Sequence, residues 1–354
     1  MMRARAYLLL TIGLLAGSGS MIFCGKAGGG DTDTPPPPAV QTFVNPLLNG
    51  ADPWVIKKND TYYYTHTLGN RIGLWKTKAM SKLAAATPVE VYRPPAGQPN
   101  SENVWAPELH YLDNKWYLYY TAGSGPLSTQ LCWVLENAGP DPTQGTWTSK
   151  GRIYATDTDF WAIDGTILET GGNRYFLWSG QPEPGKQNQN IYIAKMTNPW
   201  TLQTPTVMLT KPELGWETVG GPVNEGPQIL QNKEGHVFLV YSASGCWTDD
   251  YALGMLSLKP GADPLQLDSW IKKQQPVFSK NADHKAYGPG HNSFFMSPDG
   301  KENWILYHAN SNSGDGCTDK RNVRMQPFSW NSDGSPKFGE PVKAGTAINV
   351  PSGE

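Results

Sequence analysis

The sequence has few charged residues and no excess of either sign. Asp, Glu, Lys and Arg make up 17% of its 354 residues, and the formal net charge is -2. Soluble domains usually contain roughly 25% charged residues. A chain without excess positive charge has no general attraction to nucleic acid or to acidic lipid. We therefore expect no nucleic-acid partner.

The composition also lacks the bias toward strong helix formers that long helices require. The chain contains 38 Gly, 30 Pro, 16 Tyr and 14 Trp. Gly and Pro are the poorest helix formers, whereas aromatic residues are enriched in strands. This composition disfavours coiled coils and helical bundles and favours an all-β fold.

Long apolar segments are missing except near the N-terminus. Arg3 and Arg5 precede the apolar stretch 6–15, which is too short to span a bilayer comfortably and therefore indicates a secretory signal. Around Cys24 the segment resembles a bacterial lipoprotein signal, in which the cysteine carries the lipid. Ordinary cleavage that discards Cys24 is the alternative, because Phe23 stands where such signals usually have a small residue.

These features divide the chain into three parts. We expect residues 1–23 to be a signal peptide of lipoprotein type. Residues 24–40 include a Gly- and Pro-rich stretch and are expected to form a flexible tether. Residues 41–354 then form one folded domain. The expected location is the bacterial cell envelope, through a lipid anchor to a membrane, or the periplasm.

Five similar units recur in the expected folded domain. Each has an aromatic, strand-like block directly after a turn signal, in residues 62–67, 116–123, 175–180, 237–245 and 304–311. A shorter apolar run lies before each turn and another follows each block, so every unit contains three or four strands. This repetition is typical of a β-propeller, in which neighbouring blades bury one another. We predict an all-β, five-bladed β-propeller over residues 41–354.

The apolar run before each turn holds one polar residue, and these are Asp52, Glu108, Asp164, Glu225 and His291. The first strand of each propeller blade lines the central channel, so we expect matched positions to meet near one axis. Carboxylates clustered in a partly dry channel shift one another's pKa values, which is typical of functional sites. Glycosidic cleavage needs two carboxyl groups in different protonation states.

Four motifs carry a more specific resemblance. NPLLNGADPW at 45–54, VWAPE at 104–108, IDG at 163–165 and NEGP at 224–227 resemble the motif set of glycoside hydrolase family 43, which contains five-bladed arabinanases, arabinofuranosidases and β-xylosidases. The resemblance covers nearly the whole chain after the tether and implies an inverting hydrolase.

The resemblance also implies three acidic roles. Asp52 would be the general base that activates water, and Glu225 would be the general acid. Asp164 would orient Glu225 and keep its pKa high. Taken singly, Asp52 and Asp164 could instead be turn residues before Pro53 and Gly165.

The remaining site candidates come from the same resemblance. Trp105 is predicted to contact sugar, and Glu108 to be a wall or structural residue. His291 matches an axial histidine that in many family members binds a metal, often calcium. Calcium prefers six to eight oxygen ligands, so water would supply most of them, and a plain channel histidine is the alternative. We expect no cofactor to be required.

Two further residues are candidates for substrate binding. Arg321 and Arg324 flank the third strand of the last unit, and the resemblance favours Arg324 as the arginine that contacts the sugar, with a structural arginine as the alternative. His66 resembles a site-lining residue of some exo-acting arabinofuranosidases. It could equally be a neutral histidine packed between blades.

The cysteines fit an exported protein. Cys246 and Cys317 lie in loops after equivalent strands of adjacent units, so an inter-blade disulfide is plausible in an oxidising compartment. Cys132 is expected to be a small buried residue with a free thiol.

From the resemblance to glycoside hydrolase family 43, we predict an α-L-arabinofuranosidase that acts on plant polysaccharide or oligosaccharide. We expect it to act as a monomer. A β-xylosidase or another exo-glycosidase, such as a galactosidase, would share the same carboxylates and differ in its loops. An endo-arabinanase is the next alternative, because the choice depends on an open groove against a closed pocket. A non-catalytic glycan-binding lipoprotein is a hypothesis of another class. It predicts the loss of a catalytic carboxylate, whereas Asp52, Asp164 and Glu225 are all present.

Overall fold

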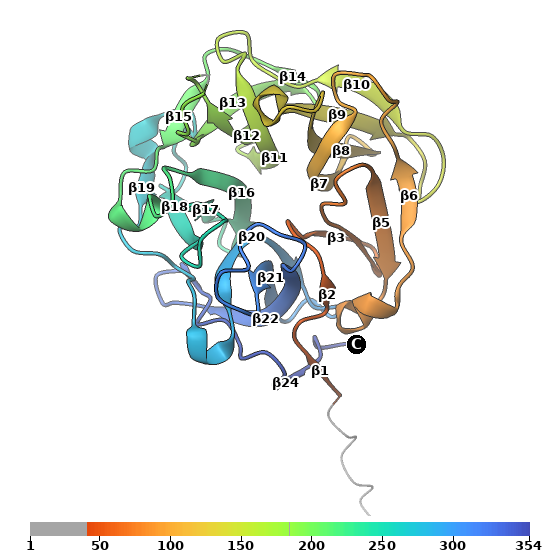
Figure 1. Cartoon of the computed structure of the whole chain (residues 1–354), viewed down its shortest axis with the longest axis vertical. Helices are drawn as coiled ribbons and strands as arrows, with labels where there is room; N and C mark the ends of the chain where they lie inside the picture. Colours follow the sequence, from red (N-terminus) through yellow and green to blue (C-terminus); the bar gives the residue numbers. More distant parts are fainter. Residues whose placement is uncertain (1–40, 184) are drawn as a thin grey trace, which may run out of the picture. The chain divides into compact units, whose positions relative to one another are not determined.

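The computed structural model describes residues 41–183 and 185–354. The predicted signal peptide, the tether and Cys24 lie outside these residues. The described part of the chain forms six antiparallel sheets, of which five are arranged as blades around a central axis (Figure 1). The prediction of a five-bladed β-propeller is confirmed.

The blades follow one another along the chain. Blade I contains β3 (Trp54–Lys58), β4 (Thr61–Thr65), β5 (Ile72–Thr77) and β6 (Val89–Tyr92). Blade II contains β7 (Glu102–Leu112), β8 (Lys115–Gly123), β9 (Leu131–Asn137) and β10 (Thr148–Arg152). Blade III contains β11 (Trp161–Thr170), β12 (Asn173–Gln181), β13 (Asn190–Asn198), β14 (Thr201–Leu202) and β15 (Val207–Thr210).

The last two blades complete the ring. Blade IV contains β16 (Asn224–Gln231), β17 (Val237–Ala243), β18 (Ala252–Leu258) and β19 (Trp270–Lys272). Blade V contains β20 (Tyr287–Met296), β21 (Asn303–Asn310), β22 (Asn322–Trp330), β23 (Pro336–Lys337) and the early strand β2 (Leu48–Asn49). Short 3-10 helices lie in the connections: η1 (Met80–Ala85), η2 (Leu127–Thr129), η3 (Gly215–Glu217), η4 (Leu267–Ser269) and η5 (Ala282–His284). No helix in the described residues is long and apolar enough to cross a bilayer.

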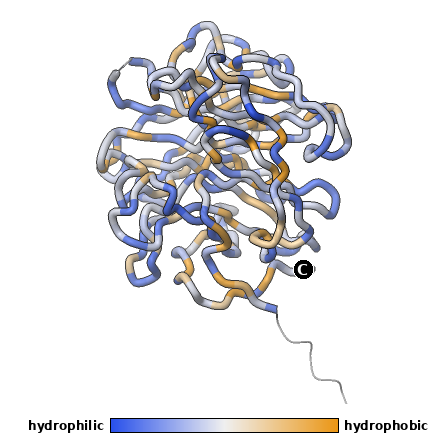
Figure 2. Tube along the Cα trace, turned by 45° about the vertical axis from the view of Figure 1, so that its right-hand side comes forward, coloured by the Kyte–Doolittle hydropathy of each residue, from blue (hydrophilic) through white to orange (hydrophobic). Residues whose placement is uncertain are grey.

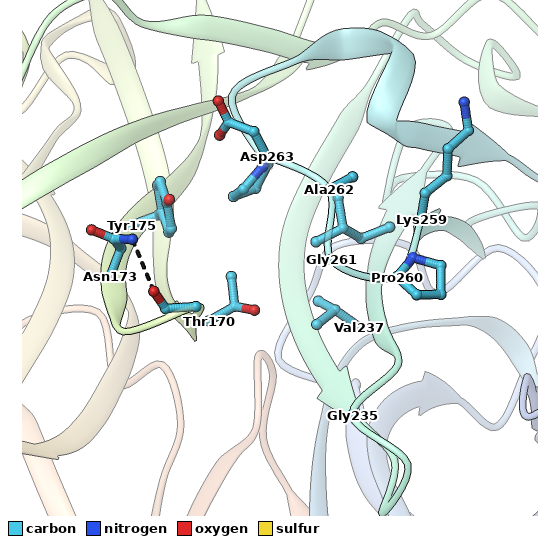
Figure 3. Close-up of a pocket in the computed structure, with 13 residues that line it drawn as sticks. Thr170, Asn173, Tyr175, Gly235, Val237, Lys259, Pro260, Gly261, Ala262 and Asp263 are labelled. Carbon is cyan, nitrogen blue, oxygen red and sulfur yellow. Dashed lines mark hydrogen bonds between the residues drawn. The ribbon is translucent and has the colours of Figure 1, made fainter.

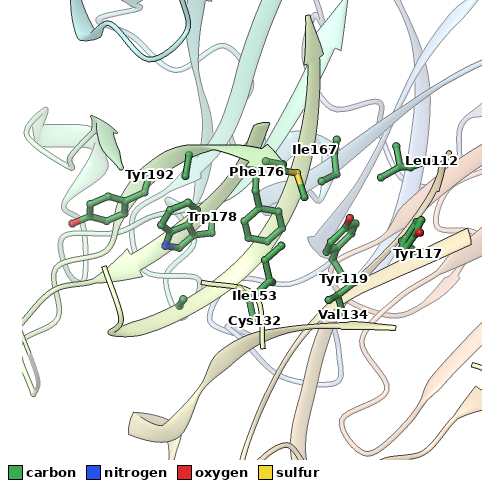
Figure 4. Packing of buried hydrophobic residues seen from close by; sticks show 13 residues of the cluster. Leu112, Tyr117, Tyr119, Cys132, Val134, Ile153, Ile167, Phe176, Trp178 and Tyr192 are labelled. Carbon is green, nitrogen blue, oxygen red and sulfur yellow. The ribbon is translucent and has the colours of Figure 1, made fainter. Parts of the chain in front are cut away.

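The aromatic blocks fill the spaces between blades. Between blades II and III, Tyr119 packs on Phe176 with ring centroids 5.5 Å apart, and Phe176 stacks on Trp178 at 5.9 Å (Figure 4). Along the trace, short apolar stretches alternate with hydrophilic ones (Figure 2). Each sheet therefore buries its two faces against its neighbours, which is why no single blade could be stable alone.

The ring is closed by segments from both ends of the described chain. The early strand β2 pairs with β22, so blade V contains strands from both ends. Next to it, β1 (Thr42–Val44) pairs with β24 (Ala347–Asn349) in a separate two-stranded sheet. Phe43 of β1 is buried and packs on Trp304 of blade V, with ring centroids 6.0 Å apart.

The first strands of blades II to V are interrupted at one matched position, and in blade I the matched residue lies just before the first strand. Here the backbone of a single residue has a positive φ, with values of 58° at Asp52, 41° at Ala106, 57° at Asp164, 53° at Gly226 and 43° at His291. In blades II to V the pairing with the second strand shifts by one residue at this point, which is a β-bulge. We call these five positions the bulge residues.

The bulge residues show that two of the five positions matched from the sequence are not equivalent to the others. The sequence matched Glu108 and Glu225 with Asp52, Asp164 and His291, but Glu108 lies two residues after its bulge residue and Glu225 one residue before. The mismatch arose because the true equivalents, Ala106 and Gly226, have no polar side chain to mark them.

We predict that Phe43 contributes to ring closure. Phe43→Ala should lower the free energy of unfolding by about 3 kcal/mol, because it removes a buried ring that packs across the closure. Val44→Ala is the control, since Val44 is 50% exposed in the same strand and its truncation should change stability by less than about 0.5 kcal/mol. Equal effects of the two substitutions in urea unfolding would contradict the prediction.

Candidate active site

The three predicted acidic residues line one cavity of about 460 Å³. Asp52, Asp164 and Glu225 come from the first-strand segments of blades I, III and IV. Trp105 and His291, from blades II and V, lie in the same wall. Side chains far apart in the sequence are thus neighbours around the channel.

Local backbone geometry places these side chains. Asp52 and Asp164 are bulge residues, whereas Glu225 immediately precedes the bulge residue Gly226. Gly165, which follows Asp164, has no room for a side chain, because a Cβ there would lie 2.1 Å from the ring of Phe176. The Asp-Gly and Glu-Gly pairs of the motifs therefore serve the bulge as well as the site.

Asp52 is held by polar groups on several sides. The Thr67 hydroxyl donates a hydrogen bond to Asp52 Oδ2 at 2.6 Å, and the Arg321 guanidinium lies 3.3 Å from Oδ1. His291 Nδ1 is also 3.3 Å from Oδ1. Burial alone raises the pKa of Asp52, but His291 and Arg321 outweigh it and hold this pKa well below its usual value. Asp52 is therefore ionised at neutral pH.

His308 takes part in this arrangement as a neutral ring. Its Nδ1 accepts the backbone N–H of Asp52 at 3.0 Å, so its proton lies on Nε2. Burial lowers the pKa of His308 to about 4, which agrees with a neutral ring.

Glu225 has a different environment from Asp52. Its only hydrogen-bond donor in the described structure is the Tyr251 hydroxyl, which lies 2.8 Å from Oε1. Burial raises the pKa of Glu225, the bond from Tyr251 lowers it, and the negative charge of Asp52 raises it again, with a net value of about 7. A large fraction of Glu225 is therefore protonated at neutral pH.

Asp164 is connected to Glu225 through the backbone of the neighbouring residue, Gly226. It is 5% exposed, and its Oδ2 accepts the N–H of Gly226 at 3.0 Å. Burial and the nearby charges of Glu225 and Asp52 raise the pKa of Asp164 well above its usual value. The cavity thus combines one ionised carboxylate with two carboxyl groups that hold protons more readily, which is the pattern that acid–base catalysis requires.

Glu108 does not line the cavity. Its carboxylate is buried, bonds to His110 Nε2 at 2.9 Å and accepts a hydrogen bond from Gln228 of blade IV. It connects blades II and IV within the channel, consistent with the structural alternative.

The surroundings of His291 do not by themselves fit calcium. Residues 41–183 and 185–354 contain no group of three or more His, Cys, Asp or Glu side chains that could hold a metal ion. One ring nitrogen of His291 already faces the carboxylate of Asp52. Because calcium prefers six to eight oxygens, water would have to supply most ligands. The calcium site stays a prediction.

The expectation for Arg324 needs correction. Its side chain is fully buried in β22, where it donates to Asn322 Oδ1 at 2.8 Å and to Ser311 Oγ at 3.0 Å, and it does not line the cavity. Arg321 lines the cavity instead. Arg324 lies within a strand and points into the blade, whereas Arg321 precedes the strand in the loop that faces the channel.

His66 is also placed in the interior rather than in the cavity wall. It is 5% exposed, stacks on Trp75 with ring centroids 4.6 Å apart, and its Nδ1 lies 3.0 Å from the Tyr64 hydroxyl. Burial lowers its pKa to about 4. Of the two alternatives from the sequence, these contacts favour the packed, neutral histidine.

Several cavity residues escaped the sequence analysis. Trp161 and Trp247 line the cavity, together with Thr67, Gln187 and Gln189. Trp161 stands three residues before Asp164, and this closeness to a motif was the one available signal. Trp247 and the glutamines lie in loops that carry no motif. Tyr251, which bonds to Glu225 from outside the cavity lining, also stands beside such a loop.

The cysteine prediction is confirmed in the structure. Cys246, in the β17–β18 loop, forms a disulfide with Cys317, in the β21–β22 loop, and both residues line the cavity. Cys132 is free and buried. The disulfide therefore joins blades IV and V at the rim of the site, next to Trp247.

A separate hollow of about 340 Å³ lies at the other end of the strands (Figure 3). It lies between the β11–β12 turn and the loop after β18, and its lining includes Thr170, Tyr175, Lys259 and Asp263. None of the predicted site residues lines it. We assign it no role.

Comparisons with known proteins agree with this geometry. Residues 43–336 match the family model described as "Glycosyl hydrolases family 43". The chain is 42% identical over 321 residues to an "Extracellular exo-alpha-(1->5)-L-arabinofuranosidase" of Streptomyces avermitilis, covering 88% of this chain and 66% of that protein. It is 38% identical over 317 residues to "Alpha-L-arabinofuranosidase 43" of Humicola insolens, covering 87% of this chain and 65% of that protein. The chain thus spans slightly less than two thirds of the length of these two relatives.

A solved structure is similar over nearly its whole length. The α-L-arabinofuranosidase from Lactobacillus brevis superposes with a TM-score of 0.81 at 39% identity, covering 86% of this chain and 98% of that one.

We predict one free thiol besides Cys24. In full-length protein carrying Cys24→Ser, thiol titration under denaturing, non-reducing conditions should detect Cys132 alone, because Cys246 and Cys317 are paired. The same sample after reduction is the control and should give three thiols. Three thiols before reduction, in protein prepared from an oxidising compartment, would contradict the pairing.

Proposed function

Because the chain belongs to glycosyl hydrolase family 43, we propose that it is an inverting exo-α-L-arabinofuranosidase. One observation carries the proposal: an ionised carboxylate, Asp52, and a carboxyl group with a pKa of about 7, Glu225, line the same cavity. This is the pair of protonation states that glycosidic cleavage with inversion uses.

The proposed reaction is a single displacement. Asp52 accepts a proton from a water molecule while the oxygen of that water forms a bond to the anomeric carbon. The bond from this carbon to the leaving oxygen breaks, and Glu225 donates its proton to that oxygen. Water attacks from the face opposite the leaving group, so the product sugar has the inverted anomeric configuration. Asp164 supports Glu225 by accepting the N–H of Gly226, the residue after Glu225. The two carboxyl groups also lie close enough that ionisation of one opposes ionisation of the other.

The cavity also suits a sugar. Trp105, Trp161 and Trp247 line it and offer flat apolar surfaces, and Arg321 supplies a donor beside Asp52. A neighbouring hollow of about 770 Å³ shares Leu127, Trp161, Gln187 and Gln189 with the cavity. A leaving chain could extend there from the cavity. The names of the similar proteins favour arabinofuranose as the sugar and α-1,5 as one linkage.

Export and anchoring form a separate part of the proposal. We propose that residues 1–23 direct export, which the relatives described as extracellular support, and that Cys24 carries a lipid anchor. We also propose that a monomer is sufficient for activity, because one chain supplies every proposed catalytic residue. Calcium near His291 remains a proposal in which water supplies most of the ligands.

We predict preferential hydrolysis of arabinofuranosides. The protein should cleave p-nitrophenyl α-L-arabinofuranoside faster than the β-D-xylopyranoside or the β-D-galactopyranoside, and should release arabinose monomers from linear α-1,5-arabino-oligosaccharides. Asp52→Asn and Glu225→Gln should each lower the rate of arabino-oligosaccharide hydrolysis by about 10²–10⁴-fold, because a sugar leaving group needs the acid as well as the base. Proton NMR of the first product should show the inverted anomer.

The control for these variants is Glu234→Gln, since Glu234 is exposed in the β16–β17 turn. Undiminished rates in both active-site variants would overturn the assignments. A preference for xyloside would indicate a β-xylosidase, and early release of mixed oligosaccharides would indicate endo action.

We predict that activity falls as pH rises through about 7. Glu225 must be protonated to act as the acid, so kcat/KM should decline above its pKa of about 7. The low-pH decline should lie well into the acid range, because the pKa of Asp52 is held well below its usual value. Tyr251→Phe removes the bond that lowers the pKa of Glu225 and should move the high-pH decline upward.

Tyr307→Phe is the matched control, since its buried hydroxyl bonds to Gln326 away from the cavity. A high-pH decline that moves downward in Tyr251→Phe, or moves equally in both variants, would refute the assignment of Glu225 as the acid.

A further inference from the structure

Each bulge residue donates its backbone N–H to the preceding blade. Asp52 donates to His308 of blade V at 3.0 Å, and Ala106 to the Thr67 hydroxyl of blade I at 2.7 Å. Asp164 donates to the Thr121 hydroxyl of blade II at 3.1 Å. Gly226 of blade IV and His291 of blade V continue the series, with bonds of 3.0 and 2.8 Å. Five inter-blade bonds thus form a closed ring around the channel.

The acceptors occupy one equivalent position in four blades. Thr121, Ser242 and His308 each lie opposite the residue that precedes the bulge of their own blade. Thr67 is equivalent, because its N–H bonds to the carbonyl oxygen of Ala51, the residue before Asp52. The acceptor side chain differs among blades, but its position opposite the residue before the bulge does not.

Blade III departs from the pattern. Its equivalent residue is Ser179, which lies opposite Ile163 and donates its hydroxyl to the carbonyl oxygen of Asn224 at 2.8 Å. The N–H of Gly226 goes instead to Oδ2 of Asp164. In this one inter-blade bond the acceptor is therefore the carboxyl group of Asp164 instead of a second-strand side chain, and the donor is the residue next to Glu225.

This exception creates a continuous connection across three blades. Thr121 of blade II accepts the N–H of Asp164, and the carboxyl group of Asp164 accepts the N–H of Gly226. Asp164 adopts a φ of 57°, which is unfavourable for a residue other than glycine and persists only where the surroundings hold it. Thr121 is fully buried, so water cannot replace its hydroxyl at low cost.

We propose that Thr121 is a positioning residue of the hydrolase. By accepting the N–H of Asp164 it fixes the bulge that aims the Asp164 carboxyl group, and through Gly226 it fixes Glu225 against the leaving oxygen. Threonine suits this task because its branched side chain restricts the rotation of the hydroxyl. The inference rests on the proposed function, since it assigns Thr121 a part in the same reaction.

A purely structural role would have a different signature. If Thr121 only helped to join blades II and III, its loss would lower the melting temperature and leave the turnover of folded enzyme unchanged. A positioning role predicts lower turnover with nearly unchanged substrate affinity, because misplacement of catalytic groups by about 1 Å can cost roughly 10²-fold in rate.

The test compares three variants with the full-length wild type. Thr121→Val keeps the shape but removes the acceptor, and should lower kcat by about 10- to 100-fold with little change in KM. Thr121→Ser restores a hydroxyl and should recover most of kcat. Thr65→Val is the matched control, because Thr65 is also fully buried in a second strand and its hydroxyl has no partner in the described structure. Its kcat should match the wild type.

A second measurement does not depend on the folding of Thr121→Val. In wild-type protein, hydrogen exchange should show the Asp164 amide protected to the level of the strand amides around it, and Thr121→Ser should preserve that protection. A rapidly exchanging Asp164 amide, a kcat unchanged in Thr121→Val, or no recovery in Thr121→Ser would each overturn the inference. Failure of the proposed function would be seen separately, as wild-type protein that cleaves none of the glycosides.

Discussion

The site depends on a backbone hydrogen bond that each blade makes with the one before it. At the bulge, a single residue turns back from the regular strand and exposes an N–H that the strand ladder cannot satisfy. The preceding blade supplies the acceptor in every case. Because the bond is repeated around the ring, the positions of Asp52, Asp164 and Glu225 are set by contacts between blades rather than by any blade alone.

Unequal surroundings then give chemically similar side chains different protonation states. Asp52 faces Arg321, His291 and the Thr67 hydroxyl, which stabilise its negative charge. Glu225 has one donor in the described structure, Tyr251, and lies in the same cavity wall as Asp52 and Asp164. The same cavity thus places the proposed base, Asp52, and the proposed acid, Glu225, in different protonation states.

Much of this arrangement could be predicted from the sequence, for identifiable reasons. The blades could be counted because aromatic blocks and turns recur, and the acidic residues could be found because they stand in local motifs beside Gly or Pro. The equivalence of Ala106 and Gly226 with Asp52 could not be seen, because it concerns backbone conformation. Arg321 and Trp247 were missed or ranked lower because loop conformation decides which side chains reach the cavity. Tyr251 was missed because only the fold brings its hydroxyl to Glu225.

The most direct test of the central claim is a crystal structure of the Glu225→Gln variant with a linear α-1,5-arabino-oligosaccharide. The account predicts the terminal sugar in the cavity, with Asp52 and the side chain at position 225 on opposite faces of the scissile bond. Their carboxyl and amide carbons should lie about 6.5–9.5 Å apart, which leaves room for a water molecule at Asp52. A separation of about 5–5.5 Å, or a sugar bound away from these residues, would contradict the account.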